Sequence, residues 1–421
     1  MPPRPISSKH QESRTNPDNP IVILSDSLSG GAANSTGRLV EALRTLGATV
    51  ERWHFSPPRA EDNPNHHSLD PKSKRPPVER VMKNFSRAQA DRMRQPRHTD
   101  ALLKRLRQRP PALVNLRNLH SCGIHHQSLR RLPPELPLVW TMHDCWPFYD
   151  CAFRWRDPST GQEDAIIADN PAGIEQRRQL FAERPDIVMV GPSAWITEHA
   201  RHELPDDMRV EHIPNGIPTT LFHPRPKAEA KAALGLNPDL TWLAFGSTWA
   251  SSRKGTDLIP RALEGLDCST LGLLCWGEAL PETFPPDLAL STHGRVDDLD
   301  QLVTLYSAAD LFLCPSRADN LPNTVLESLA CGTPVVGSNT GGIPDMARPG
   351  QTGWLFESSN ADAFHAQLRA ALDARNEWPA YQERGRQLVE AEFAVEKIAR
   401  RYLTLYEELI ATPVTHRHPA K

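Results

Sequence analysis

The amino-acid sequence predicts an α/β protein built from two doubly wound parallel-sheet domains in series. Its 421 residues are too many for one ordinary hydrophobic core and suit two domains. Short apolar runs alternate with amphipathic stretches, which is the pattern of strand–helix units around a parallel sheet. A proline-rich stretch at residues 214–231 interrupts this alternation, which then starts again, so we place the domain boundary there.

Apolar runs in the first half predict strands, and the amphipathic stretches between them predict helices. We expect strands at residues 21–27, 49–55, 112–116, 138–144, 187–193 and 209–215. We expect helices at residues 33–46, 122–131, 174–183 and 194–203.

The second half repeats the same rhythm and ends differently. We expect strands at residues 242–247, 272–277, 291–294, 311–316 and 334–339, and helices at 257–266, 299–309 and 323–330. The segment 392–410 has apolar residues at helical spacing and no strand after it, which predicts a long terminal helix. The predicted organisation is a disordered polar tail (1–20), a first domain (21–218), a second domain (219–391) and a C-terminal helix (392–412) packing back toward the first domain.

Bulk composition excludes several classes of protein. A net charge of −3 argues against a dedicated nucleic-acid binder, which is usually clearly basic. No apolar run reaches the roughly 18 residues of a membrane-spanning helix, and the first 20 residues contain no signal-like apolar stretch. The seven cysteines form no C-x-x-C pair, so we expect buried thiols in a reducing compartment. These observations predict a cytoplasmic protein.

One basic stretch stands apart from this composition. Residues 59–109 carry 14 Lys or Arg against 6 Asp or Glu, with few strongly apolar positions. The stretch is interpreted either as a solvated insertion with one or two basic helices or as a contact for an anionic membrane surface or a charged acceptor. The second interpretation would place the protein peripherally at the inner face of the plasma membrane.

The strongest chemical motif is PSRADNLPNTVLESLACGTPVVGSNTGGIPD at residues 315–345. A strand ends in a loop that carries Asp319, and a helix opens around Pro322 and Asn323. The helix N-terminus offers backbone N–H groups and a positive dipole end, which suit a diphosphate. Asp319 and Glu327 stand on either side of that seat and can accept hydrogen bonds from sugar hydroxyls.

A second motif, WLAFGSTWASSRKGTDLI at residues 242–259, follows a strand with the cations Arg253 and Lys254. Two adjacent cations at the mouth of a parallel sheet suit a leaving diphosphate, whose negative charge grows as the glycosidic bond breaks. In the first domain, His143 of WTMHDCWPF is expected at a strand end facing the cleft. The loop with Gly30 and Gly31 lets backbone N–H groups approach a ligand closely.

The order of these motifs resembles glycosyltransferase family 4, over roughly residues 21–410. The matching pattern is an acid, seven residues, a Glu, a small-Gly-x-Pro-Val-Val strand and a Gly-Gly loop. The D-N-L-P-N-T form resembles the branch that makes exopolysaccharides and capsules. Two departures stand out, because Asp319 occupies the family's first Glu position and Ser247 occupies a usual Arg position. Arg253 is the candidate to supply that missing charge.

The resemblance implies a GT-B fold, in which two Rossmann-like domains face a cleft and the second holds a nucleotide-diphosphate sugar. It implies catalytic roles for His143, Asp319, Arg253 and Lys254. Residues implied in donor binding are Gly30, Gly31, Arg295, Val296, Asn320, Leu321, Pro322, Asn323, Thr324 and Glu327, the last through the ribose. Acceptor-side candidates are Arg117, His120, Asp144 and Trp146, with packing as the alternative role.

The function implied is a retaining, metal-independent glycosyltransferase that moves a sugar from a nucleotide-sugar co-substrate to a saccharide or lipid-linked saccharide acceptor. Its place would be in cell-surface polysaccharide synthesis, with no further cofactor. Two alternatives remain open: a catalytically inactive GT-B scaffold or regulatory subunit of an assembly complex, and a sugar-nucleotide epimerase. Turnover of a nucleotide-sugar separates the enzyme from the scaffold, and release of an altered sugar without acceptor identifies the epimerase.

Overall fold

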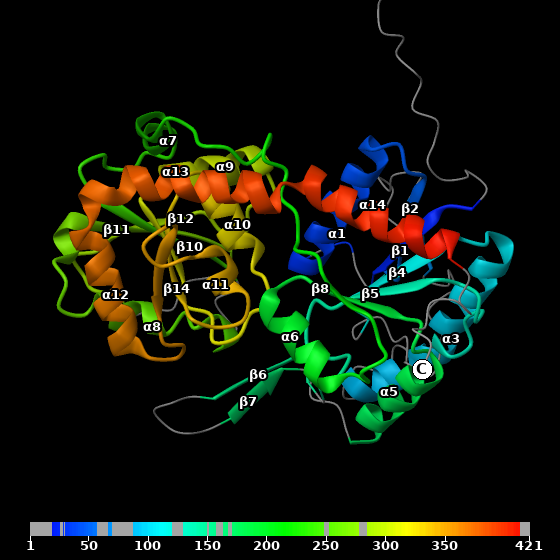
Figure 1. Ribbon diagram of the computed structural model, residues 1–421. Helices are drawn as coiled ribbons and strands as arrows, with labels where there is room; N and C mark the ends of the chain where they lie inside the picture. The colour runs from blue at the N-terminus through cyan, green and yellow to red at the C-terminus, as the bar shows by residue number, and fades with distance from the viewer. Residues whose placement is uncertain are drawn as a thin grey trace, which may run out of the picture.

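The protein contains two parallel-sheet domains joined by short crossing segments (Figure 1). The computed structural model describes residues 19–25, 28, 30–56, 66–69, 87–119, 129–149, 151–156, 163–166, 171–247, 252–277 and 284–412. Two doubly wound α/β domains were predicted from the sequence, and the prediction is confirmed.

The first sheet has seven parallel strands in the order β3-β2-β1-β4-β5-β8-β9. These are β3 (His66–Ser68), β2 (Val50–His54), β1 (Ile21–Ser25), β4 (Leu113–Arg117), β5 (Leu138–Thr141), β8 (Val188–Gly191) and β9 (Val210–His212). The helices of this half are α1 (Gly31–Thr45), α3 (Arg87–Gln108), α5 (Pro171–Glu183) and α6 (Ala194–Glu203).

The second sheet has six parallel strands in the order β12-β11-β10-β13-β14-β15. These are β12 (Ala289–Thr292), β11 (Leu271–Gly277), β10 (Thr241–Ser247), β13 (Leu311–Cys314), β14 (Val335–Ser338) and β15 (Gly353–Phe356). Its helices are α7 (Lys227–Ala233), α8 (Leu258–Leu263), α9 (Leu299–Ala308), α10 (Asn323–Ala330), α11 (Ile343–Met346), α12 (Ala361–Asp373) and α13 (Trp378–Leu388).

Both sheets reverse their strand order at one point, which determines where ligands bind. In the first sheet β1 lies between β2 and β4, and in the second β10 lies between β11 and β13. Crevices for ligands form outside the carboxyl ends of the strands at such a reversal. The residues that follow β1, β4, β10 and β13 are therefore the ones placed to bind a ligand.

The last helix, α14 (Val395–Ala411), belongs to the first domain by its packing. Its buried side chains recur at helical spacing, including Ile398, Tyr402 and Leu409, and they join the core formed by α1 and one face of the first sheet. Backbone hydrogen bonds join Ile217 to Phe393 and Val395, so the two segments that cross between the domains lie side by side. In Figure 1, α13 and α14 run across the tops of the two domains in turn.

Several elements differ from the sequence predictions. The strand expected at 138–144 ends at Thr141, because Cys145 and Phe148 begin a turn held by backbone hydrogen bonds. Not predicted were β3, β15, and an antiparallel hairpin of β6 (Phe153–Arg156) and β7 (Glu163–Ile166). Most of the helix expected at 122–131 lies outside the described residues.

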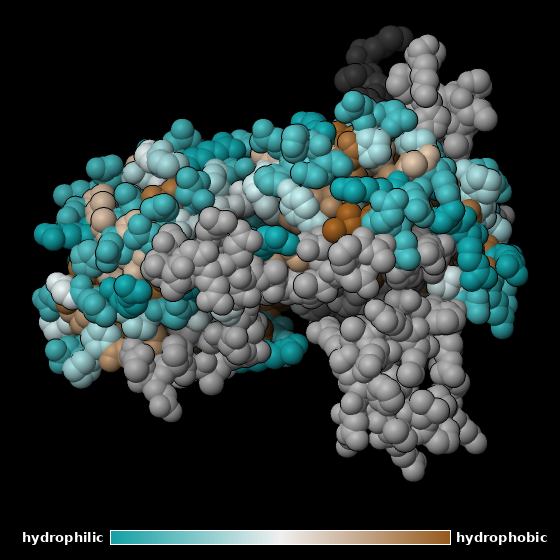
Figure 2. Space-filling view, turned by 90° about the horizontal axis from the view of Figure 1, so that it is seen from below, coloured by the Kyte–Doolittle hydropathy of each residue, from teal (hydrophilic) through white to brown (hydrophobic). Residues whose placement is uncertain are grey.

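The basic stretch 59–109 contains α3, whereas much of the rest of it lies outside the described residues. Lys104 and Arg107 are exposed on α3, but the Arg105 guanidinium packs 5.6 Å from the centroid of the Trp53 ring. Among the described residues no helix is long and apolar enough to span a bilayer. In Figure 2 the described residues on the face shown are mostly hydrophilic, and the hydrophobic ones lie in small groups.

Candidate active site

Two cations and one carboxylate meet at the strand-order reversal of the second sheet. Lys254 Nζ lies 2.6 Å and Arg253 Nη1 3.3 Å from the same oxygen, Oδ2 of Asp319. Arg253 and Lys254 lie in a 3₁₀ turn, Ser252–Lys254, after β10, and Asp319 lies in the loop after β13. The sequence prediction placed these three residues near one diphosphate, and the structure brings them together.

Asp319 is ionised in this arrangement. Burial alone would raise the pKa of its carboxyl, but the Coulombic attraction of Lys254 and Arg253, with their hydrogen bonds, lowers the pKa below its usual value. Two cations and one carboxylate leave one positive charge at the cleft. The cluster therefore attracts an anionic ligand while keeping a carboxylate that accepts hydrogen bonds.

Glycine at two positions lets the loops of this cluster approach one another. Gly341 has φ +54°, and a Cβ added there would lie 1.5 Å from the backbone oxygen of Asp319. Gly255 has φ +63°, and its added Cβ would lie 2.0 Å from the backbone oxygen of Pro315. Only glycine fits both the backbone conformation and the space.

Glu327, the fifth residue of α10, is held by two partners. Tyr306 donates its hydroxyl to Oε2 at 2.8 Å, and Arg38 Nη2 donates to Oε1 at 2.5 Å. Burial, together with the negative charge of Glu327, raises the pKa of Tyr306 well above its ordinary value, so the phenol stays protonated and donates. A carboxylate has about four lone-pair positions, so Glu327 keeps capacity for further donors such as ribose hydroxyls.

Arg38 lies on α1 in the first domain and was not predicted as a site residue. Its guanidinium carbon lies 5.0 Å from the centroid of the Phe222 ring, and its Nη1 is buried without a hydrogen-bond partner among the described residues. Gly31 and Arg38 are seven residues apart on α1, and Asn323 and Glu327 are four apart on α10. Both spacings place residues on one face of a helix, which is the only local signal for this contact.

The loop before α10 and the start of that helix touch the first domain at several points. Asn320 Nδ2 donates to the backbone oxygen of Met142 at 2.8 Å, and Ser193 Oγ donates to Asn320 Oδ1 at 2.6 Å. Asn323 Nδ2 donates to the backbone oxygen of Gly31 at 2.8 Å. The two domains are therefore in contact across the cleft, directly beside Asp319.

A further contact across the domains was also missed from the sequence. Asp345 Oδ2 accepts a hydrogen bond of 2.8 Å from the backbone N–H of Ala194, the first residue of α6. A carboxylate at this helix N-terminus is electrostatically favourable. Burial is the main cause of the raised pKa of Asp345, and this hydrogen bond opposes it.

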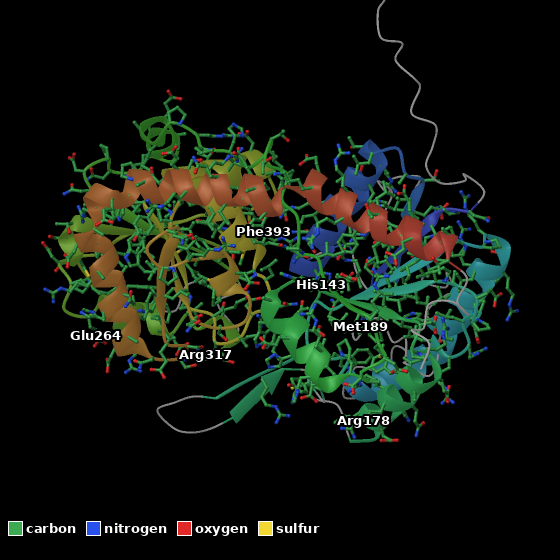
Figure 3. The ribbon with its side chains drawn as sticks, in the orientation of Figure 1. His143, Arg178, Met189, Glu264, Arg317 and Phe393 are labelled. Atoms are coloured by element: carbon green, nitrogen blue, oxygen red, sulfur yellow. The ribbon has the colours of Figure 1, made fainter. Side chains whose placement is uncertain are left out.

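His143 follows β5 where the two domains meet (Figure 3). Arg117, the last residue of β4, donates its Nε–H to His143 Nε2 at 3.1 Å. Because this Nε2 accepts a hydrogen bond, the ring carries its proton on Nδ1. Arg117 is 1% exposed and His120 lies outside the described residues.

The remaining acceptor-side candidates are packed in the structure. Trp146 is 8% exposed and lies in the first-domain core, with its ring under the Arg177 guanidinium at 4.9 Å. Asp144 accepts a hydrogen bond from the Trp146 backbone at 3.0 Å, which stabilises the turn after β5. The expected stacking of Trp146 on a sugar ring is therefore not supported by its position, since its ring packs in the core.

The other donor-side candidates differ in their exposure and in what they pack against. Gly30 and Gly31 are exposed at the start of α1, Pro322 precedes α10, and Thr324 is half-buried in its first turn. Leu321 is 5% exposed and belongs to the second-domain core, as Val296 does in part. Arg295 is exposed and pairs with Asp297 at 2.9 Å. Leu321 is thus a packing residue beneath the loop.

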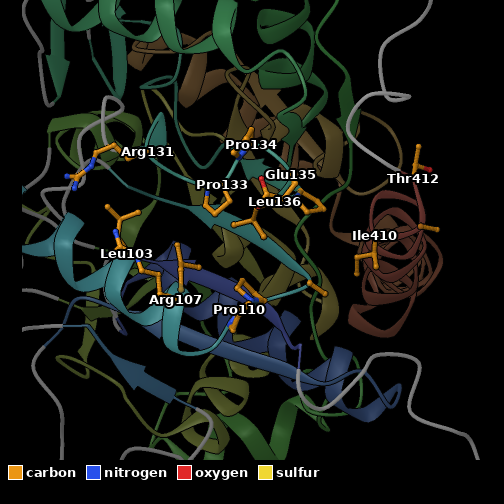
Figure 4. A pocket seen from close by; sticks show the side chains of 15 residues that line it. Leu103, Arg107, Pro110, Arg131, Pro133, Pro134, Glu135, Leu136, Ile410 and Thr412 are labelled. Carbon is orange, nitrogen blue, oxygen red and sulfur yellow. The ribbon is translucent and has the colours of Figure 1, made fainter.

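The described residues include no group of three or more His, Cys, Asp or Glu side chains placed to hold a metal ion. A cavity of about 890 Å³ lies away from the charged cluster, near the amino ends of β4 and β5 (Figure 4). Its lining is largely proline and leucine, with Ile410 of α14 on one side. It is separate from the strand ends that carry the candidate site.

Comparisons with known proteins decide the family. Residues 29–221 match the family described as Glycosyltransferase Family 4, and residues 290–388 match Glycosyl transferases group 1. An alpha-maltose-1-phosphate synthase of Mycobacterium tuberculosis is 31% identical over 307 residues, which is 66% of this chain and 74% of that protein. The chain is a family 4 glycosyltransferase. A D-inositol 3-phosphate glycosyltransferase of Segniliparus rotundus is 30% identical over 182 residues, and the match covers 40% of each chain.

Solved structures agree on the fold of this glycosyltransferase. Sucrose-phosphate synthase from Thermosynechococcus elongatus gives a TM-score of 0.71 at 21% identity, covering 93% of this chain and 99% of that one. The lipopolysaccharide-biosynthesis glycosyltransferase WaaG gives 0.64 at 15% identity, covering 92% and 99%. At these identities the likeness shows the fold alone, which is the GT-B arrangement of two Rossmann-like domains.

Proposed function

We propose that this glycosyltransferase moves a sugar from a nucleotide-diphosphate donor to a saccharide or lipid-linked saccharide acceptor, with retention of configuration and without a metal. The observation that carries the proposal is the convergence of Arg253 and Lys254 on Asp319 at the strand-order reversal of the second sheet. A cluster with one net positive charge suits a leaving diphosphate better than a neutral ligand.

The donor binds by adding its phosphate oxygens to this cluster. The Lys254 ammonium has three donors and the Arg253 guanidinium has five, so each can bind phosphate oxygens without abandoning Asp319. Asp319 is ionised and accepts hydrogen bonds from hydroxyls of the transferred sugar. Glu327, four residues into α10 beyond Asn323, takes the ribose hydroxyls. His143 is the candidate donor of a hydrogen bond to this sugar, through its Nδ1–H.

We favour front-face attack, in which the leaving phosphate accepts the acceptor's proton while the oxocarbenium-like sugar is still bound. The carboxylate nearest His143 in sequence is Asp144, which is 6% exposed and accepts the Trp146 N–H. It is poorly placed to form a covalent intermediate, so the donor's own phosphate is the better base.

Screening nucleotide-sugars by thermal shift and then following donor hydrolysis tests the proposal. The anomeric proton coupling of the first product, measured by NMR before mutarotation, reports the stereochemistry. Inverted configuration would contradict the retaining mechanism, and the loss of turnover in excess EDTA would contradict metal independence. If nucleotide-sugars bind and none is ever turned over, the alternative of an inactive scaffold holds.

We also propose that the enzyme works at the cytoplasmic face of a membrane, in cell-surface polysaccharide synthesis. The basic stretch 59–109 supports this, since Lys104 and Arg107 are exposed on α3. Clustered cations bind anionic lipid weakly at physiological salt, where the Debye length is about 8 Å. Co-sedimentation with anionic vesicles should fade as salt rises and weaken when both residues are replaced by Glu. No sedimentation at low salt would leave the stretch as a solvated insertion.

A further inference from the structure

Arg117 is a buried cation with no counter-ion among the residues that the structure describes. Its side chain is 1% exposed, its Nε donates to His143, and its guanidinium carbon lies 5.9 Å from the centroid of the Tyr402 ring. In the described part of the chain no carboxylate pairs with Arg117, and its Nη1 is buried without a hydrogen-bond partner. A buried charge that lacks a partner is costly, so a native site of this kind is completed by an anion.

Two other buried arginines of this chain, Arg184 and Arg317, each bind a carboxylate. Arg184 binds Asp186 through two hydrogen bonds of 2.8 and 2.9 Å, although it is only 6% exposed. Arg317 is 9% exposed and binds Asp257 through two hydrogen bonds of 2.7 Å. Unlike these two, Arg117 has no carboxylate partner among the described residues, and it lies where a ligand is expected.

Arg117 ends β4 at the strand-order reversal of the first sheet, beside β1 and opposite Thr141 of β5. The next residue, Asn118, has φ +48°, so the chain turns sharply away just after Arg117. Over this edge the second domain makes its contact between Asn320 and the Met142 backbone. Breaking that contact would open the edge beside Arg117 to a substrate.

We propose that Arg117 binds an anionic group, a phosphate ester or a carboxylate, on the sugar that lies next to His143. The inference rests on the proposed transfer reaction and names the chemistry of one of its substrates. The guanidinium presents parallel N–H donors that match the oxygens of either group. The anion belongs either to the acceptor or to the transferred sugar itself, as a uronic acid.

Calorimetric titration of glucose, glucose 1-phosphate and glucuronate tests the acceptor source. Each is added to the enzyme saturated with the nucleoside diphosphate that it binds best. Wild type is expected to bind at least one anionic sugar about 10-fold or more tightly than glucose, the usual effect of a hydrogen bond to a charged group. Arg117→Gln should lose that preference and Arg117→Lys should keep part of it. Replacing the exposed Arg400 with Gln serves as the surface-charge control.

Hydrolysis of UDP-glucose and UDP-glucuronate without acceptor tests whether the anion belongs to the transferred sugar. If it does, wild type should hydrolyse UDP-glucuronate faster than UDP-glucose, and Arg117→Gln should not. Equal binding and hydrolysis of neutral and anionic sugars by wild type would overturn the inference. An unchanged preference in Arg117→Gln would overturn it too, and Arg117→Lys takes its place if the Gln variant does not fold. Nucleotide-sugar turnover without any anion preference sinks only this inference, whereas absence of turnover sinks the proposed function.

Discussion

Replacing Arg38 with Met tests whether the ion pair across the cleft couples closing of the domains to turnover. Met keeps much of the length of the side chain and removes its charge. The pair joins Arg38 Nη2 to Glu327 Oε1 at 2.5 Å, with side chains 12% and 7% exposed. The two residues lie on α1 and α10, so the contact exists only while the domains are together.

The size of the effect follows from that geometry. A hydrogen bond to a charged group contributes about 1.5–3 kcal/mol. Breaking a permanently buried pair costs more, about 3–5 kcal/mol, but separated domains allow water to hydrate both side chains. We therefore expect the closed form to lose about 1.5–3 kcal/mol, which corresponds to a fall of roughly 10- to 150-fold in turnover.

The assay compares kcat/KM for the nucleotide-sugar with the calorimetric affinity for the nucleoside diphosphate. Arg38→Met should lower turnover while changing that affinity by less than about threefold, because the second domain holds the nucleotide. A double-mutant cycle with Glu327→Gln should give a coupling energy of about 1.5–3 kcal/mol. The double variant should be little worse than the poorer single variant.

Arg44→Met is the matched control on the same helix. Arg44 binds Glu41 and the backbone oxygen of Val50, which both lie in the first domain. It should leave turnover nearly unchanged. Additive losses in the cycle would refute the coupling, and tighter nucleotide binding by Arg38→Met at full turnover would show that Arg38 competes with the ribose.

Three further substitutions probe the second domain. Lys254→Ala should lower kcat by about 100-fold or more and leave nucleoside monophosphate binding unchanged, since its partner charge develops in the transition state; wild-type activity would remove it from the leaving-group site. Glu327→Ala should weaken donor binding by about 1.5–3 kcal/mol. In this variant a donor with 2′-deoxyribose should lose little further affinity, and additive losses would show that Glu327 does not hold the ribose. Gly341→Ala should lower the Tm at least twice as far as Gly350→Ala, because both have left-handed backbones (φ +54° and +71°) but only Gly341 meets a backbone oxygen; equal shifts would contradict this.

The fold and half of the candidate site could be predicted because both are local in sequence. Buried parallel strands give apolar runs such as 311–316, and the loops that carry the candidate site follow directly after them. Asp319 and Glu327 lie on one loop and the helix that follows it, so their spacing alone brings them near each other. Periodicity failed for Trp146 and Leu321, since an aromatic or apolar side chain near a cleft looks the same in sequence whether it faces ligand or core.

The other part of the candidate site depends on which faces of the two domains meet, and no local sequence pattern indicates that. Arg38 is separated from Glu327 by 289 residues, and on α1 it is simply a polar residue on an amphipathic helix. Its spacing from Gly31 and that of Glu327 from Asn323 become informative only once α1 and α10 are known to lie against each other. The same holds for Arg117: that no carboxylate pairs with it in the described part of the structure is visible only after its neighbours are placed. Charges whose partners come from another domain, or from a substrate, are therefore the part of such a site that requires three-dimensional structure.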